Sequence, residues 1–331
     1  MIKLENVRKI FDQRGIAGLH DINIDFSGSK LFALMGPSGS GKTTLLKILS
    51  GTLPIDSGKV TSETQIAYLD SFTSIDRNKT MHQTLFDAIT VTESEDQKIQ
   101  LIRDMSMLFE MTGKLKTLVS ELSAGQYQRL LLASFLINRP HVLLLDEPFS
   151  NLDESLRHEL MLQLKELIIE RDLMVIWVTH QSQEALSFAD EIILLHHGSV
   201  EQRGSAQDLY YKPRSIFAAQ FFGHTNLFAI RYNKDTSLWT TPWGQLPLNI
   251  VSDKEDVLLV IPEEAFTIDI GPYEGIVQNN QFLGGQVRLT LEFNSQTLTL
   301  KLPAKSYLQT PKGSRIAFNI KWLECFEIGC L

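Results

Sequence analysis

An eight-residue glycine-rich string directly after a short apolar run constrains this chain more than any other feature. The two segments are Leu31-Phe32-Ala33-Leu34-Met35 and Gly36-Pro37-Ser38-Gly39-Ser40-Gly41-Lys42-Thr43. The apolar run predicts a short buried strand, and residues 43–49 predict a helix. Glycines between a strand and a helix let consecutive backbone N–H groups and the helix N-terminus point at one anion. The sequence therefore predicts a loop that cradles the phosphates of a nucleoside triphosphate.

The last residues of this string have separate tasks in a phosphate loop. We expect Lys42 to reach the β- and γ-phosphates of ATP, and we expect the Thr43 hydroxyl to ligate Mg²⁺. Thr44 follows directly and completes the expected set of nucleotide contacts. The alternative is a glycine-rich turn that matches by chance, and the motifs further along the chain make that alternative weak.

A second apolar run, Val142-Leu143-Leu144-Leu145, ends in the paired carboxylates Asp146 and Glu147. Such a run predicts another buried strand, whose end lies beside the phosphate loop in a sheet of this kind. We expect Asp146 to hold Mg²⁺ through water and Glu147 to polarise the attacking water as a general base. The alternative is an acidic strand end that faces solvent.

Three short strings complete a recognisable order along the chain. They are Leu122-Ser123-Ala124-Gly125-Gln126, Ser150-Asn151-Leu152-Asp153 and Val178-Thr179-His180. They resemble the signature motif, the D-loop and the switch histidine of ABC ATPases. Together with the phosphate loop and the acidic strand end, they extend the resemblance over residues 1 to about 226.

The resemblance implies a shared site. In that family two ATPase domains pair head to tail, and each ATP lies between the phosphate loop of one copy and the signature motif of the other. Ser123, Gly125 and Gln126 are then expected to contact the γ-phosphate from a helix start, a position suited to anions. His180 is expected to hold the γ-phosphate and the attacking water in place.

Two further site residues are carried over from the same resemblance. Phe11 stands where an aromatic ring stacks on adenine, and a place in the core is an equal alternative. Asp70 follows the stretch Ile66-Ala67-Tyr68-Leu69 and stands where the family has a glutamine that contacts Mg²⁺. A carboxylate can ligate Mg²⁺ as well. The alternative is misalignment, because the hairpin expected over residues 58–68 is short for the family.

The rest of the chain divides into two parts of different pattern. Apolar runs at 174–178 and 192–195 predict further strands of an α/β P-loop ATPase domain over residues 1–226, with a helical subdomain at about 81–125. From 227 to 331, short alternating strands predict a small all-β domain, a barrel of the OB-like or TOBE kind. Asn294-Ser295 is expected to form a hairpin turn there.

Residues 198–226, and Glu274-Gly275-Ile276-Val277 further on, resemble bacterial importers that carry such a C-terminal domain. The resemblance implies a homodimer that docks two permease subunits, has a solute-binding protein as an indirect partner, and lies on the cytoplasmic face of the inner membrane. It leaves the solute open, and the C-terminal domain either binds a regulatory solute or only serves dimerisation. A soluble ABC ATPase, an exporter subunit and a nucleotide-binding regulatory subunit with slow turnover are the alternatives.

Composition agrees with this interpretation. The 331 residues suit two domains, and the net charge of −8 argues against a nucleic-acid partner. No apolar run approaches the ~20 residues of a membrane-spanning helix, and the N-terminus does not resemble a signal peptide. Cys325 and Cys330 are expected to be free thiols in a reducing cytosol.

Overall fold

The computed structural model describes most of the chain as two compact units, Met1–Ala206 and Gln207–Leu331. The described residues are 1–11, 18–62, 64–70, 73–90, 94–150, 152–223, 225–241, 244–246, 255–307, 309–321 and 324–327, without the side chains of 246, 306 and 324–327. Asn151, Cys330 and the side chain of Cys325 lie outside this set. Within it, every helix is too short or too polar to cross a membrane.

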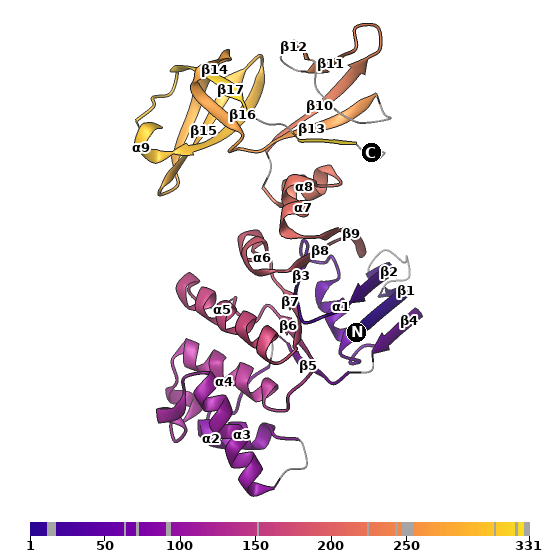
Figure 1. Ribbon diagram of the computed structural model, residues 1–331, viewed down its shortest axis with the longest axis vertical. Helices are drawn as coiled ribbons and strands as arrows, with labels where there is room; N and C mark the ends of the chain where they lie inside the picture. Colours follow the sequence, from indigo (N-terminus) through magenta and orange to yellow (C-terminus); the bar gives the residue numbers. More distant parts are fainter. Residues whose placement is uncertain are drawn as a thin grey trace. The chain divides into compact units, whose positions relative to one another are not determined.

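The first unit is built on a six-stranded sheet, which Figure 1 shows nearly edge-on. Its order is β5 (Ile66–Leu69), β6 (Val142–Asp146), β7 (Met174–Val178), β3 (Leu31–Met35), β8 (Glu191–His196) and β9 (Ser199–Gly204). The first five strands are parallel, and β9 pairs antiparallel with β8. Strands β3, β6 and β7 are buried along their whole length, as their unbroken apolar runs predicted.

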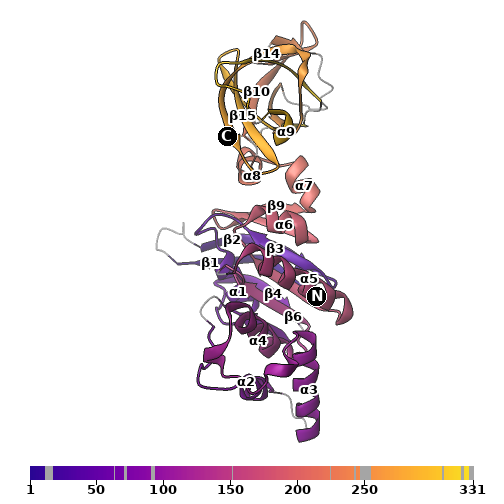
Figure 2. The ribbon, with the colours of Figure 1, turned by 90° about the vertical axis from the view of Figure 1, so that its left-hand side faces the viewer.

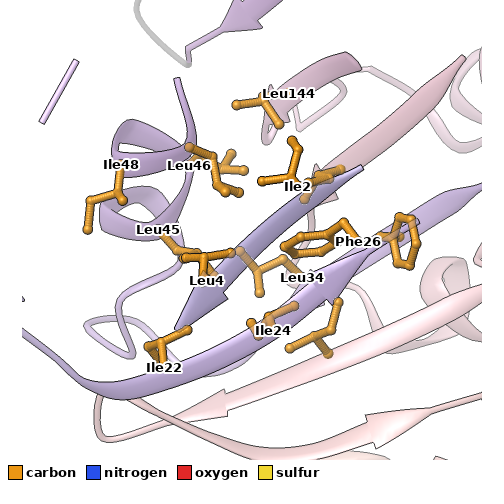
Figure 3. Close-up of a cluster of buried hydrophobic side chains, with 14 of the residues drawn as sticks. Ile2, Leu4, Ile22, Ile24, Phe26, Leu34, Leu45, Leu46, Ile48 and Leu144 are labelled. Atoms are coloured by element: carbon orange, nitrogen blue, oxygen red, sulfur yellow. The ribbon is translucent and has the colours of Figure 1, made fainter. Parts of the chain in front are cut away.

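Two layers cover this sheet. On one face lie α5 (Glu154–Glu170) and α6 (Ser182–Phe188), and on the other lies α1 (Lys42–Leu49) (Figure 1). A second sheet packs over α1, with the order β2 (Gly18–Phe26), β1 (Ile2–Ile10) and β4 (Ser57–Ser62). Figure 3 shows the shared core, in which side chains from β1 and β2 meet those of α1, Leu34 and Leu144. This packing fixes the start of α1, and so the loop before it.

The hairpin expected over residues 58–68 is wrong. Strand β4 pairs with β1 in the antiparallel sheet, whereas β5 pairs in parallel with β6. The reason is that β5 is a short, mostly apolar strand, and the all-apolar β6 offers it a place at the edge of the large sheet. Asp70 therefore follows a strand of the parallel sheet.

The segment between 81 and 125 is helical, as its pattern predicted. It contains α2 (Met81–Ala88), α3 (Glu95–Leu108) and the 3-10 turns η1 (Thr112–Lys114) and η2 (Val119–Glu121), and it leads into α4 (Ala124–Leu136). Thr80 and Ser94 open α2 and α3 with capping boxes. The apolar residues of α3 that repeat at helical spacing form its buried face.

In the described residues from 206 onward, two antiparallel sheets and three short helices are present. One sheet has the order β12 (Gly244–Leu246), β11 (Leu238–Thr241), β10 (Asn226–Asn233), β13 (Asp256–Ile261) and β18 (Glu324–Glu327). The other has β16 (Gln296–Pro303), β15 (Gln286–Phe293), β14 (Phe266–Phe282) and β17 (Arg315–Ile320). The helices are α7 (Ala206–Tyr211), α8 (Ile216–Phe221) and α9 (Ala304–Tyr307). Figure 2 shows the strands curving around one interior, where both sheets share a core.

Two details relate this unit to the expectations. Asn294 and Ser295 both have positive φ, 48° and 61°, and they join β15 to β16 as the hairpin turn expected there. The compact units separate after Ala206, because Ala219 of α8 is buried against Leu258 and Val260 of β13. A domain boundary at 226/227 stays a prediction about where the ATPase fold ends.

Candidate active site

The expected chemistry gathers at one edge of the parallel sheet. Gly36 follows β3, Asp146 ends β6 with Glu147 next to it, His180 lies just beyond β7, and Asp70 follows β5. Because these strands are parallel, their carboxyl ends share an edge, which is where α/β sheets bind ligands. The sequence motifs, separated by up to about 140 residues along the chain, thus come from strands of a single sheet.

The glycine loop packs too closely for side chains at two of its positions. A Cβ on Gly36, at φ +144°, would lie 2.2 Å from the Leu195 carbonyl oxygen. A Cβ on Gly41, at φ +101°, would lie 2.4 Å from Cδ2 of Leu19. Only glycine fits such contacts at positive φ. The loop is therefore held against β8 on one side and β2 on the other.

Lys42 lies within the loop that it is expected to serve. Its ammonium donates hydrogen bonds to the carbonyl oxygens of Gly36 and Pro37, both at 2.9 Å. Burial lowers the pKa of Lys42, and the carboxylates of Glu147 and Asp146 partly oppose that effect. A cation that has lost hydration in this way favours an anionic partner.

Ser40 supplies a second sign that the loop is shaped for a ligand. Its side chain is 2% exposed, and its hydroxyl has no hydrogen-bond partner in the described part of the chain. Burying a hydroxyl without a partner is unfavourable by about 1–3 kcal/mol. Such an unsatisfied donor inside a phosphate loop is suited to a phosphate oxygen.

Asp146 is the buried carboxylate of the site, 3% exposed. Burial raises its pKa, while a hydrogen bond from the Thr43 side chain lowers it. Among the described residues, no three His, Cys, Asp or Glu side chains form a metal cluster. Mg²⁺ is usually held by one or two carboxylates together with substrate phosphates, so Thr43 and Asp146 fit such an ion without a full protein cage.

The register of β5 and β6 brings Asp70 close to Asp146. Leu69 pairs with Leu145, and the two aspartates are the next residues along each chain segment. The Thr73 hydroxyl donates to the Asp70 carboxylate at 2.5 Å. Tyr68 lies two residues before Asp70. Its burial, together with the charges of Asp146 and Asp70, raises the pKa of its phenol. The acidic side chain at 70 therefore lies in the same electrostatic neighbourhood as Asp146.

Glu147 and His180 approach each other beyond the ends of β6 and β7. His180 Nδ1 lies 3.6 Å from Glu147 Oε2, and both side chains are partly exposed. Glu147 also has φ +50°, in the left-handed region that non-glycine residues seldom adopt. Such backbone strain is held in place only by its surroundings and is concentrated at functional sites. Both side chains line a hollow that also includes Phe149 and Gln181.

Phe11 is 57% exposed, so the structure excludes the alternative that it belongs to the core. The neighbouring residue Ile10 pairs with Gly18, whose carbonyl oxygen lies 3.6 Å from the place of a Cβ on Gly41. This chain of contacts brings the end of β1 next to the phosphate loop. The Lys9 ammonium lies 5.9 Å from the centre of the ring, so one neighbour of the ring is cationic.

The signature-like residues open α4 in a capping box. The Ser123 hydroxyl accepts from the Gln126 backbone N–H at 3.4 Å, and the Gln126 side chain accepts from the Ser123 N–H at 3.2 Å. Gly125 is buried, and a Cβ there would lie 2.7 Å from Leu156 of α5. Ser123 and Ala124 are exposed, so the helix start is accessible from outside the chain.

Sequence reasoning missed a group of polar side chains that line the same hollow, contributed by α5 and by the segment around His180. They are Arg157, Glu184 and Thr179. Arg157 and Glu184 form an ion pair across 27 residues of sequence. Because no local pattern connects two positions so far apart, only the fold reveals the pair.

Comparisons with known proteins place the chain in a family. Residues 19–150 match the ABC transporter family. The chain is 30% identical to the spermidine/putrescine import ATP-binding protein of Clostridium novyi, over 96% of this chain and 95% of that protein. It is 37% identical to a sulfate/thiosulfate import ATP-binding protein of Chromobacterium violaceum, over 68% of this chain and 67% of that protein.

Two solved structures extend the comparison. A metal-chelate type ABC transporter in an inward-facing conformation shares the fold, with a TM-score of 0.60 at 22% identity over 75% of this chain and 97% of that one. A dimeric ATP-binding cassette bound to ADP and Pi after hydrolysis has a TM-score of 0.55 at 26% identity, over 62% of this chain and 99% of that one.

A phosphate loop, an acidic strand end and a histidine on one edge of a parallel sheet define the class of P-loop nucleoside triphosphatases. Within that class, the chain belongs to the ABC transporter family, as an ATP-binding subunit of the importer type. It binds and hydrolyses ATP to energise solute import by a bacterial transporter, as part of a complex with membrane components. The soluble, non-transport alternative loses its support.

Proposed function

We propose that ATP is hydrolysed between two copies of this chain arranged head to tail. The phosphate loop, Glu147 and His180 come from one sheet edge of a single chain, whereas Ser123, Gly125 and Gln126 open a separate helix with an exposed start. A second copy would bring that helix start to the γ-phosphate as an N–H donor surface. The related cassette bound to ADP and Pi is dimeric, which supports this arrangement.

The nucleotide contacts of one copy follow from the loop. Residues 36–41 other than Pro37, which has no N–H, would supply backbone N–H groups to the phosphates. Lys42 would supply an ammonium, and Ser40 its unsatisfied hydroxyl. Thr44 continues this surface at the start of α1. Exposed Phe11, beside the loop, would stack its ring on adenine.

Thr43, Asp146 and Asp70 would hold Mg²⁺ at the carboxyl ends of β5 and β6. When bound there, the ion would supply positive charge that neutralises the phosphate oxygens. A cation would also compensate the burial that raises the pKa of Asp146. Asp70 adds a negative charge that a glutamine at this position would lack. The site would therefore bind divalent ions more tightly with Asp70 than with a glutamine there.

Glu147 and His180 would carry the chemical step, and their 3.6 Å approach is the observation on which this assignment rests. Glu147 accepts a proton from water while the water oxygen bonds to the γ-phosphorus. The bond from the γ-phosphorus to the bridging oxygen breaks, and ADP and phosphate result. His180 orients the γ-phosphate and the water.

In the whole transporter, this dimer would dock two permease subunits on the cytoplasmic face of the inner membrane, and a solute-binding protein would act through the permeases. Two relatives that align over 96% of this chain, and so over its second unit, are named for spermidine/putrescine import. Three others of that name align over 68–69%, and the sulfate relatives align over 68%. That observation favours a polyamine as the transported solute. Stimulation of the assembled transporter's ATPase by spermidine, and none by sulfate, would support it; the reverse would overturn it.

The decisive test of the site is Glu147→Gln in the full-length chain. This variant should bind ATP and accumulate as a dimer in its presence, with turnover lowered at least ~100-fold, because only the base is lost. ATP binding, size-exclusion chromatography and phosphate release measure the three effects. Lys42→Ala is the matched control and should lose ATP binding itself. Normal turnover in the glutamine variant would exclude Glu147 as the base.

A further inference from the structure

A largely buried chain of polar contacts joins Leu152, before α5, to the residues around His180. Arg157, in the first turns of α5, donates from Nη2 to the Leu152 carbonyl oxygen at 2.6 Å. Its Nη1 bonds Oε1 of Glu184 on α6. The two side chains are only 12% and 15% exposed. One guanidinium thus holds two segments that the chain separates.

The same chain continues to both neighbours of His180. Glu184 accepts from the Thr179 hydroxyl through its other oxygen, Oε2, at 3.4 Å. The Thr179 hydroxyl in turn accepts from the backbone N–H of Gln181 at 3.1 Å. Thr179 and Gln181 flank the histidine on either side, so its backbone is fixed at two points.

These groups lie in the hollow that contains the reacting residues. Arg157, Glu184 and Thr179 line it together with Glu147 and His180. Removing one partner of a buried ion pair leaves the other charge without compensation. The pair therefore holds the start of α6 near Leu152, and His180 lies directly before α6.

We propose that Arg157, through Glu184, is a positioning residue for ATP hydrolysis. It touches neither nucleotide nor water. It keeps His180 within reach of Glu147 and ties that placement to Leu152, in the segment that resembles the D-loop. A shift of the Leu152 backbone would thereby reach the histidine through Arg157 and Glu184. The inference rests on the proposed roles of Glu147 and His180.

Kinetics of the full-length chain test this role. Arg157→Ala should lower kcat at least ~10-fold while the KM for ATP and the equilibrium affinity for ATP stay within about twofold. Arg157→Lys keeps the charge but lacks the fork that serves two acceptors, so its kcat should be intermediate. Glu184→Gln keeps an acceptor for Thr179 and should also be intermediate.

A matched control separates position from stability. Arg203 forms a comparable, partly buried ion pair with Glu191 between β9 and β8. Arg203→Ala should lower the melting temperature without lowering kcat at temperatures where it is folded. A general loss of stability would make the kcat values of the Arg157 variants fall in step with their melting temperatures. That result would overturn the proposal.

A double substitution shows whether Arg157 acts through the histidine. In a His180→Ala chain, adding Arg157→Ala should lower the residual kcat less than about threefold, because the group to be positioned is gone. A full multiplicative loss would contradict the proposal.

Wild-type turnover in both Glu147→Gln and His180→Ala would instead reject the proposed function. If these two variants are impaired and Arg157→Ala is not, only the positioning role fails. Should Arg157→Ala not fold, Arg157→Lys and Glu184→Gln provide the same comparison.

Discussion

Two buried carboxylates, one in each unit, have the same exposure and opposite surroundings. Asp146 and Glu263 are each 3% exposed. Glu263 accepts from the Arg288 guanidinium and from the Thr225 hydroxyl, both at 3.1 Å, and the Lys301 ammonium lies 3.3 Å away. The second unit therefore compensates its buried charge with its own cations.

In the described part of the chain, Asp146 forms no ion pair, and the Lys42 and Lys47 charges only partly offset its burial. Its partner is the Thr43 hydroxyl, while the Lys42 ammonium bonds to two loop carbonyls and Glu147 adds a like charge. Burial raises the pKa of Asp146 as a result. A charge that the fold satisfies serves stability, and a charge that the fold leaves in need of a cation indicates a site.

The substitution Asp146→Asn should give the largest effect that distinguishes Asp146 from Glu263, and the effect should be on ATPase activity. ATPase activity of the full-length chain should fall at least ~100-fold, because the metal-side charge is lost at the reacting phosphates. The free energy of unfolding should not fall, since a neutral amide replaces a poorly solvated carboxylate. Phosphate release and urea unfolding measure the two quantities. A destabilised variant with normal turnover would reverse the assignment.

Glu263→Gln should give the opposite result with a smaller effect. The free energy of unfolding should fall by about 1–3 kcal/mol, because hydrogen bonds from partly exposed cations are lost in the second unit. Turnover per folded molecule should remain at the wild-type value. Thermal unfolding followed together with ATPase activity checks both. Loss of turnover without loss of stability would show that this cluster also serves the reaction.

The contrast also separates what sequence can predict from what it cannot. The phosphate loop is local, since a strand, three glycines and a helix start within about a dozen residues fix its geometry. For the same reason β3, β6 and β7 follow directly from their apolar runs. The carboxyl-edge site was predictable because parallel strands always bring such ends together.

Partners that are distant in sequence were not predictable. Glu263 is 25 residues from Arg288 and 38 from Thr225, and Arg157 is 27 from Glu184. Such pairs depend on which strands and helices become neighbours. The wrong hairpin prediction over residues 58–68 has the same cause, because β5 pairs with β6 and not with β4, which precedes it in the sequence. Even the exposure of Phe11 depended on where β1 ends.

The pH dependence of stability should show the smallest effect, and it examines Asp146 alone. Its pKa in the folded chain is raised above the ordinary value of 3.8, so the folded state keeps this proton to higher pH than the unfolded chain does. Well below 3.8 both states are protonated, and the stability no longer depends on pH through this group. As the pH rises from there through the raised pKa, the unfolded chain releases its proton first, and the folded state loses stability relative to it. Above the raised pKa the loss is constant.

Asp146→Asn lacks this proton, so its free energy of unfolding should exceed that of the wild type by an amount that grows across this window and then levels off. Urea unfolding of both chains at a series of pH values measures the difference. A difference that shrinks with rising pH would mean that the fold itself stabilises the ionised carboxylate, and the contrast with Glu263 would disappear.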